Sequence, residues 1–325
     1  MRITGVTYAV KKTHRTRYFV LAVILLLLAA IIAVIILSTY KSWNLLHPER
    51  KPIDAFSSNI VPEYRDISFR TRGSDGTFVL NGWLFQVKNS DRAVILVHSY
   101  GSNRLQFGVD TVDLIKEFMN KGYNVFTFDL RNSGESDGKD STFGYHEKDD
   151  IKAAIKYMRD QGSTHITLMG FSTGASAAIM AAAESTSSDG TPLVDAVVAD
   201  SPYSDLKEYL RKNLDKWTSL PAFPFNRAIS LAIDLTGGIK SRDASPVNAV
   251  TAENPPYLML IHSRNDDLIP IINSIELFQR YSALNASGAE FWQTEDNGNA
   301  IGYMINRDEY MERVFNFLEK VYPKD

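Results

Sequence analysis

The feature that most limits the fold is an uninterrupted apolar run near the N-terminus. Residues 18–37 read YFVLAVILLLLAAIIAVIIL and contain no charged side chain. At about 1.5 Å per residue, a helix of this length spans about 30 Å, the hydrocarbon thickness of a bilayer. A core helix of a soluble protein is rarely apolar on every face over such a length. The run therefore predicts a transmembrane anchor over residues 18–39.

The charges around this run predict its orientation. Residues 1–17 carry five basic residues and no acidic residue, which leaves a net charge of −8 on residues 18–325. Because basic residues stay in the cytoplasm, we expect a single-pass protein of the cell membrane, with residues 1–17 as a cytoplasmic tail and the following domain extracellular. A cleaved signal peptide is the alternative. Its apolar part is usually about 7–15 residues long and ends in small residues, whereas STYKSW follows here.

The composition excludes several kinds of site. The chain has no cysteine, which removes disulfides, thiolate nucleophiles and cysteine-ligated metals, so covalent chemistry would use oxygen or nitrogen. A net charge of −3 gives no support for a nucleic-acid partner. The acidic pairs at 266–267 and 295–296 are more typical of solvated loops than of a cation site, and no dinucleotide or P-loop motif is present. We expect no cofactor and no metal.

After a polar tether over residues 40–63, a domain over residues 64–325 alternates apolar runs with helical patterns. Runs such as AVILV and LMLI are continuous, as in strands buried on both faces of a parallel sheet. Strands are predicted at 64–72, 77–87, 92–99, 124–130, 165–172, 194–201, 257–263 and 289–294. Helices are predicted at 105–121, 147–161, 173–183, 271–281 and 307–321. The pattern predicts an α/β fold, with a mostly parallel sheet of about eight strands flanked by helices.

One insertion interrupts this alternation. Residues 203–253 contain no clear strand but two helical patterns, of which the second covers 226–235. The first places on one face the residues Leu206, Leu210, Leu214 and Trp217. An insertion after the sixth strand would lie over the carboxyl ends of the strands, so we expect a small helical cap.

The strongest local motif is G-F-S-T-G at residues 170–174, between the strand ITLM and the small-residue helix ASAAIMAAA. A serine in a G-x-S-x-G turn of this kind is held in a strained backbone conformation that exposes its hydroxyl in front of a helix N-terminus. A serine that only caps the helix is the structural alternative. The context makes Ser172 a candidate nucleophile.

With this motif in place, residues 64–322 resemble the α/β-hydrolase fold family, in the branch of membrane-anchored bacterial serine hydrolases related to prolyl-oligopeptidase-like enzymes and esterases. Four further segments carry the resemblance: H-S-Y-G-S-N at 98–103, D-L-R-N-S-G-E-S at 129–136, D-S-P at 200–202 and I-H-S-R-N-D-D-L-I-P at 261–270. The resemblance implies a serine hydrolase that acts on an ester or peptide-like acyl substrate.

The resemblance also implies a role for each matched residue. Ser172 would be the nucleophile, and the backbone N–H groups of Tyr100 and Thr173 would form the oxyanion hole. Asp266 would be the acid of the triad, with Asp267 as the alternative.

The histidine that a Ser-His-Asp mechanism needs as general base is missing from its expected place. The family places it between the last strand and the last helix, where this chain reads TEDNGNAIGY over 294–303. The family's histidine position aligns with Asn299, whose amide cannot accept a proton near neutral pH. Three other histidines, His98, His146 and His262, are candidates for a base, and each fits better as a structural residue.

Two functions are open on this basis. One is a serine hydrolase of weak activity that still forms an acyl-enzyme. The other is a catalytically inactive hydrolase fold used as a surface module for binding or sensing. A histidine-to-asparagine change in this copy alone, by engineering or recent decay, is a third explanation. The expected partners are a small acyl or peptide-like substrate and the lipid bilayer around residues 18–39. The cap aromatics Trp217, Phe223 and Phe225 would either form an apolar acyl-binding wall or pack the cap onto the domain.

Overall fold

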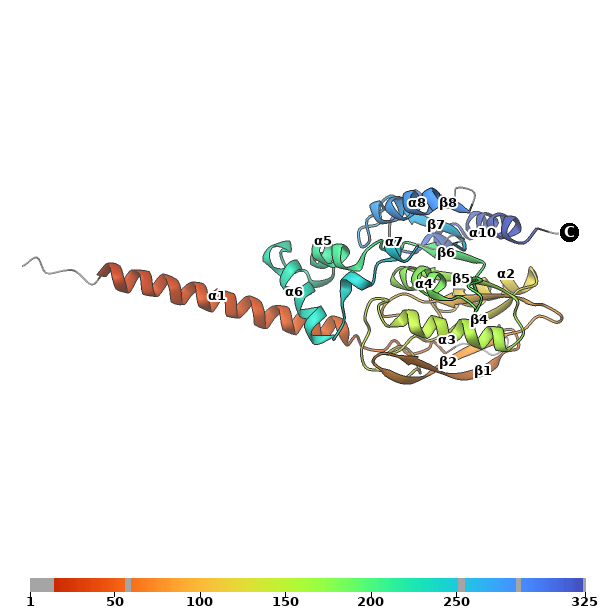
Figure 1. Ribbon diagram of the computed structural model, residues 1–325, viewed down its shortest axis with the longest axis horizontal. Helices are drawn as coiled ribbons and strands as arrows, with labels where there is room; N and C mark the ends of the chain where they lie inside the picture. The colour runs from red at the N-terminus through yellow and green to blue at the C-terminus, as the bar shows by residue number, and fades with distance from the viewer. Residues whose placement is uncertain (1–14, 56–59, 251–254, 285–287, 324–325) are drawn as a thin grey trace, which may run out of the picture.

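A long helix projects from an α/β domain in the computed structural model (Figure 1), which describes residues 15–55, 60–250, 255–284 and 288–323. This helix, α1 (Arg15–Leu46), is long and apolar enough to cross a membrane, with a mean hydropathy of 3.6 over its most apolar part. The predicted cytoplasmic tail lies almost entirely outside the described residues.

Eight strands form one sheet in the order β1-β2-β4-β3-β5-β6-β7-β8. β2 pairs antiparallel with β1 and β4, and every other neighbouring pair is parallel. The strands are β1 (Arg65–Gly73), β2 (Gly76–Phe85), β3 (Arg92–Val97), β4 (Asn124–Phe128), β5 (His165–Phe171), β6 (Ala196–Asp200), β7 (Tyr257–Ser263) and β8 (Ala289–Thr294). The predicted strands and the mostly parallel sheet are confirmed.

Helices cover both faces of the sheet. One face is covered by α3 (Glu147–Asp160), α4 (Thr173–Glu184) and α8 (Ile272–Leu284), and the other by α2 (Asp110–Asn120) and α10 (Arg307–Val321). The short helix α9 (Gly302–Ile305) precedes α10. The predicted helix over 105–121 starts late, at Asp110, because Gly108 has a φ of 57° and closes a turn back to the carbonyl oxygen of Leu105.

The two faces explain why the central strands are continuously apolar. In β3, Ala93, Ile95 and Val97 belong to the apolar cluster under α3 and α4. Their neighbours Val94 and Leu96 belong to the cluster under α2 and α10. Because successive side chains of a strand point to opposite faces, a sheet covered on both sides needs apolar residues at every position.

The end of α1 differs from the sequence prediction. A polar tether was predicted over residues 40–63, but the helix continues to Leu46 and its last turns are docked on the domain. The buried side chains of α1 are Ser38, Ser42, Leu45 and Leu46, which recur at helical spacing and form one face. The first part of the predicted tether is therefore helical and packs against the domain.

The cap lies beside this end of α1 (Figure 1). It consists of α5 (Leu206–Thr218), α6 (Ala222–Thr236), the 3₁₀ turn η1 (Ser241–Asp243) and α7 (Pro246–Ala249). A third apolar cluster joins the cap, the end of α1 and the loop that carries Phe143. The described part of the predicted cap ends at residue 250.

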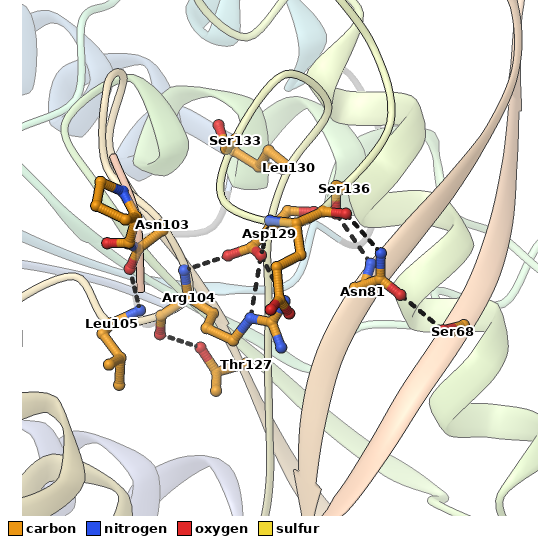
Figure 2. A network of polar contacts seen from close by, with 12 residues as sticks. Ser68, Asn81, Asn103, Arg104, Leu105, Thr127, Asp129, Leu130, Ser133 and Ser136 are labelled. Carbon is orange, nitrogen blue, oxygen red and sulfur yellow. Dashed lines mark hydrogen bonds and ion pairs between the residues drawn. The ribbon is translucent and has the colours of Figure 1, made fainter. Parts of the chain in front are cut away.

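A buried ion pair holds the loop after β4 (Figure 2). Arg104 Nη2 lies 2.6 Å from Asp129 Oδ2, and both side chains are almost fully buried. The backbone N–H groups of Arg104 and Glu135 also donate to Asp129. Ser136 Oγ donates to the carbonyl oxygen of Asp129 and accepts from the N–H of Asn81. The network fastens the loop to β2 and to the segment after β3.

Candidate active site

Ser172 lies at the turn between β5 and α4. Its φ of 53° and ψ of −121° fall in a region that non-glycine residues rarely adopt. A Cβ on Gly174 would lie 2.2 Å from the carbonyl oxygen of His98. A Cβ on Gly170 would lie 2.6 Å from the Cα of Ala175. Both glycines are thus required by the close approach of α4 to the sheet, and the turn has the strain that the motif predicts.

The two backbone groups expected in an oxyanion hole lie next to Ser172. The Tyr100 N–H donates to Thr173 Oγ1 over 2.9 Å, so the Thr173 hydroxyl occupies this donor. Thr173 is the first residue of α4, where N–H groups have no partner within the helix. Ser172 itself is only 3% exposed, and its hydroxyl has no hydrogen-bond partner among the described residues. A bound carbonyl oxygen would therefore have to displace or share the Thr173 hydroxyl.

Asp266 and Asn299 are in direct contact. Asn299 Nδ2 donates to Asp266 Oδ2 over 2.8 Å. Asp266 Oδ1 accepts from the backbone N–H groups of Leu268 and Ile269, which fixes the carboxylate. Asp267, the alternative acid, is exposed to solvent. The amide of Asn299 is thus bonded directly to the carboxylate that was expected to be the acid of a triad.

Hydrogen bonds between neighbouring strand ends bring these segments together. The Ser172 N–H donates to the carbonyl oxygen of Asp200, and the Ser201 N–H donates to that of Ile261. Ser201 Oγ in turn accepts from the N–H of Ala300, the residue after Asn299. The turn that carries Ser172 and the loop that carries Asn299 are therefore both fastened to the end of β6.

A model of the BD-FAE family matches residues 86–281, which include Ser172 and Asp266. The chain belongs to the BD-FAE family. The uncharacterized protein YqkD of Bacillus subtilis (strain 168) is 27% identical over 245 residues, 74% of this chain and 76% of that protein.

Solved structures show the fold of this BD-FAE chain. A Pyrococcus furiosus esterase is similar at a TM-score of 0.66 and 27% identity, over 85% of this chain and 98% of that one. An acylaminoacyl peptidase from Pyrococcus horikoshii shares the fold at a TM-score of 0.57 and 18% identity, over 82% of this chain and 43% of that one. The predicted α/β-hydrolase fold is confirmed, and the esterase similarity supports a hydrolase.

The buried histidines of this BD-FAE domain serve the structure. His98 Nε2 accepts from the N–H of Leu130, and Nδ1 lies 2.8 Å from the carbonyl oxygen of Ser99. Burial lowers the pKa of His98, which favours this neutral form. His262 Nε2 lies 2.7 Å from the carbonyl oxygen of Ile269 and 3.4 Å from Asp266 Oδ2. Its Nδ1 is bonded to a serine hydroxyl, so both histidines have their ring nitrogens occupied.

The third candidate base, His146, is the N-cap residue just before α3. Its Nδ1 faces Asp75, 3.8 Å from Oδ1, and its ring packs edge-on against Tyr145. Burial lowers the pKa of His146 as well. The contacts of His98, His146 and His262 support a structural role for all three histidines.

Aromatic residues of the cap cover the site. Trp217 packs edge-on against the ring of Tyr100, whose face stacks on Phe143. The Trp217 indole N–H donates to the hydroxyl of Tyr209 over 2.6 Å. Phe225 also packs in this cluster. Phe223 does not: it is 85% exposed, so the prediction that it packs the cap onto the domain was wrong.

One contact of the site was missed by sequence reasoning. The Tyr100 hydroxyl donates to the carbonyl oxygen of Leu45, at the end of α1, over 2.6 Å. The loop that carries Tyr100, an expected oxyanion donor, therefore contacts α1, the helix that is apolar enough to cross a membrane. The helical spacing of Ser42, Leu45 and Leu46 was a signal that α1 continues and docks, but nothing in the sequence indicated what it would dock against.

Metal ligands are not gathered at this site. Within the described residues no group of three or more histidine, cysteine, aspartate or glutamate side chains could hold a metal ion. The oxygens of Asp266 are occupied by protein donors. The arrangement can supply a hydroxyl nucleophile and a fixed carboxylate.

Asp200, directly behind Ser172, should make the stability of the protein depend on pH. Its side chain is buried, and this burial raises its pKa to about 7 from 3.8, although the Tyr310 hydroxyl donates to it. A raised native pKa stabilises the fold below the unfolded value, and this contribution is lost as pH rises through about 7. The stability of Asp200→Asn relative to wild type should therefore rise between about pH 4 and pH 7, by up to about 4 kcal/mol.

Urea unfolding of the full chain in detergent across this pH range measures the effect. Asp267→Asn changes an exposed carboxyl in the same region and serves as the matched control. Because this carboxyl is exposed and not buried, Asp267→Asn should not reproduce the rise expected for Asp200→Asn. Parallel pH profiles for wild type and Asp200→Asn would contradict the prediction.

Proposed function

We propose that this protein is a membrane-anchored serine hydrolase for ester or peptide-like acyl substrates, with Ser172 as its nucleophile and weak turnover. In the proposed topology, α1 is the single membrane anchor, residues 1–17 lie in the cytoplasm and the hydrolase domain lies outside the cell.

The observation that carries the proposal is the strained conformation of Ser172. A φ of 53° at a serine costs free energy, on the order of 1–3 kcal/mol, and such strain persists mainly where the surroundings impose it. Two glycines and the helix behind Ser172 impose it here. The turn leaves the hydroxyl without a protein partner among the described residues, which suits a nucleophile.

The proposed reaction has two steps. Ser172 Oγ attacks the carbonyl carbon, its proton passes to water, and the leaving alcohol or amine departs with a proton from water. A water molecule then attacks the carbonyl carbon of the acyl-serine ester, the bond to Ser172 Oγ breaks, the carboxylic acid leaves and Ser172 Oγ regains a proton from water. The backbone N–H groups of Thr173 and Tyr100 would stabilise the oxyanion, the latter after release from Thr173 Oγ1.

The weakness of the site follows from Asn299. Its amide can neither take the Ser172 proton nor return it to the leaving group. In a serine protease the loss of the triad histidine costs on the order of 10⁶ in turnover, and oxyanion and binding effects account for what is left. Slow acylation is therefore expected even with a well-placed serine.

Labelling with a fluorophosphonate tests the nucleophile directly. The full chain in detergent should be labelled slowly, and Ser172→Ala should abolish labelling because the probe reacts with the serine oxygen. Ser133→Ala, a buried serine in the loop after β4, is the matched control and should be labelled like wild type. Equal labelling of wild type and Ser172→Ala would refute the assignment.

The second candidate function is a catalytically inactive module that binds or senses a ligand. The bond from Asn299 to Asp266 favours it, because it satisfies the acid without providing a base. Complete absence of fluorophosphonate labelling in the folded wild-type chain would support this alternative.

A further inference from the structure

Three large apolar side chains of α6 are exposed. Phe223 is 85% exposed, Leu231 61% and Leu235 74%. Leu231 and Leu235 are four residues apart, so they lie on one face, which Arg227 continues by one more turn. Phe223 has a non-helical backbone conformation (φ −102°, ψ 132°) and precedes the regular part of the helix, so the spacing does not place it on this face. We call Arg227, Leu231 and Leu235 the cap stripe. The opposite face of α6 is buried in the third apolar cluster through Ile229 and Ile233, so the cap stripe points away from the domain.

The cap stripe belongs to a helix that packs against α1. Ser42 Oγ lies 2.9 Å from Thr236 Oγ1 at the end of α6, and the Leu46 side chain lies against Gly237. Figure 1 shows the cap on the side of the domain from which α1 projects. The cap stripe therefore lies next to the helix that would enter the bilayer.

The depth of this contact matches the edge of a bilayer. The apolar run ends at Leu37, and Ser42 lies about 8 Å further along the helix. The headgroup layer of one leaflet is about 5–8 Å thick. Tyr40 and Trp43 are 59% and 56% exposed at the same level, where aromatic residues favour the membrane–water interface. The contact between α1 and α6 thus falls at the headgroup level.

The charge of the cap agrees with this position. Residues 203–250 contain seven basic and five acidic residues, although residues 18–325 carry −8 overall. Arg211, Lys212 and Lys216 are exposed on α5, and Arg227 lies within the cap stripe. Basic side chains beside an apolar helix face are typical of segments that lie in the interface of an anionic bilayer.

We infer that the cap stripe is a membrane-binding surface, which lies in the outer headgroup and upper acyl layer of the bilayer that α1 crosses. The inference rests on the proposed anchoring by α1. It goes further because it makes the cap a second point of membrane attachment. With α1 and α6 both held, the cap over Ser172 faces the lipid surface.

The absence of cysteine in the natural chain makes a depth measurement direct. Single variants Leu231→Cys and Leu235→Cys of the full chain, labelled with an environment-sensitive fluorophore, are placed in vesicles of mixed anionic and zwitterionic phospholipid. Some lipids carry bromine near the headgroup or, in a second set, deep in the acyl chain. Leu27→Cys, in the middle of α1, reports the anchor. Tyr257→Cys, partly exposed at the start of β7, is the matched control far from the strands' carboxyl ends.

The expected result is a blue-shifted emission at Leu231 and Leu235, quenched more by shallow than by deep bromine. The Leu27 label should be quenched by deep bromine, and the Tyr257 label by neither. Labels at 231 and 235 that behave like the one at 257, while the label at 27 is quenched, would overturn the inference and leave the anchor intact. A blue shift without quenching would mean that protein, such as a second copy of the chain, covers the stripe, which also overturns it. An unquenched label at 27 would overturn the anchor and the inference together.

Discussion

Replacing Asn299 by histidine is expected to raise the hydrolysis of a p-nitrophenyl ester by at least about 100-fold, and by up to about 10⁴-fold. Asn299 Nδ2 already donates to Asp266 Oδ2 over 2.8 Å. An imidazole at this position would donate Nδ1–H to the same oxygen and present Nε2 as the base for Ser172. The gained rate should rise with pH as the imidazole loses its proton near about pH 6.5, a step that wild type lacks.

Two variants separate this mechanism from a general change in the loop. Asn299→Gln keeps an amide and introduces no base, so its rate should stay near that of wild type. Asn299→His combined with Ser172→Ala should lose the gain completely. A folded Asn299→His protein with no gain in rate would show that residue 299 is not the position of the base.

Replacing Arg104 by methionine is expected to destabilise the fold by about 3–5 kcal/mol. Arg104 and Asp129 side chains are 1% and 0% exposed, and the guanidinium donates to Asp129 Oδ2 through Nη2 and Nε. Without the guanidinium, the Asp129 carboxylate would be left buried with only two backbone donors. An uncompensated buried charge costs far more than the loss of a surface pair, so the midpoint of urea unfolding should fall strongly.

Arg313 offers a closely matched control. Like Arg104, it forms an ion pair, here with Glu309, and lies over a tryptophan ring, that of Trp292. Its side chain is 46% exposed, and such surface pairs contribute about 0–1 kcal/mol. Arg313→Met should therefore shift the midpoint little. Equal losses of stability for the two variants, measured on the full chain in detergent, would contradict the role assigned to burial.

The sheet was predictable because its signals are local. A strand covered on both faces must be apolar at successive positions, and Val94 and Ile95 show this within six residues of β3. Helix boundaries were less accurate where one residue decides them. Gly108 delays the start of the predicted helix to Asp110 through its left-handed conformation, and periodicity does not reveal this.

The candidate site was predictable where a residue type and its place in the chain order carry the chemistry. The G-x-S-x-G turn was expected around Ser172, and the loop of Asn299 was expected beside Asp266; the structure has both. Their catalytic roles stay predictions. Sequence reasoning could not tell that the Tyr100 N–H is bonded to Thr173 Oγ1, because the partners are 73 positions apart.

By itself, the sequence determined the apolar helix, the order of strands and helices, and the turn that strains Ser172, because each depends on neighbouring residues. Only the tertiary structure decided where α1 ends, that Leu45 accepts from Tyr100, and that Phe223 faces outward while Trp217 covers the site. These features are contacts between segments far apart in the chain. An apolar face can pack against many apolar segments of the chain. Only the packing of the whole domain determines which segment it contacts.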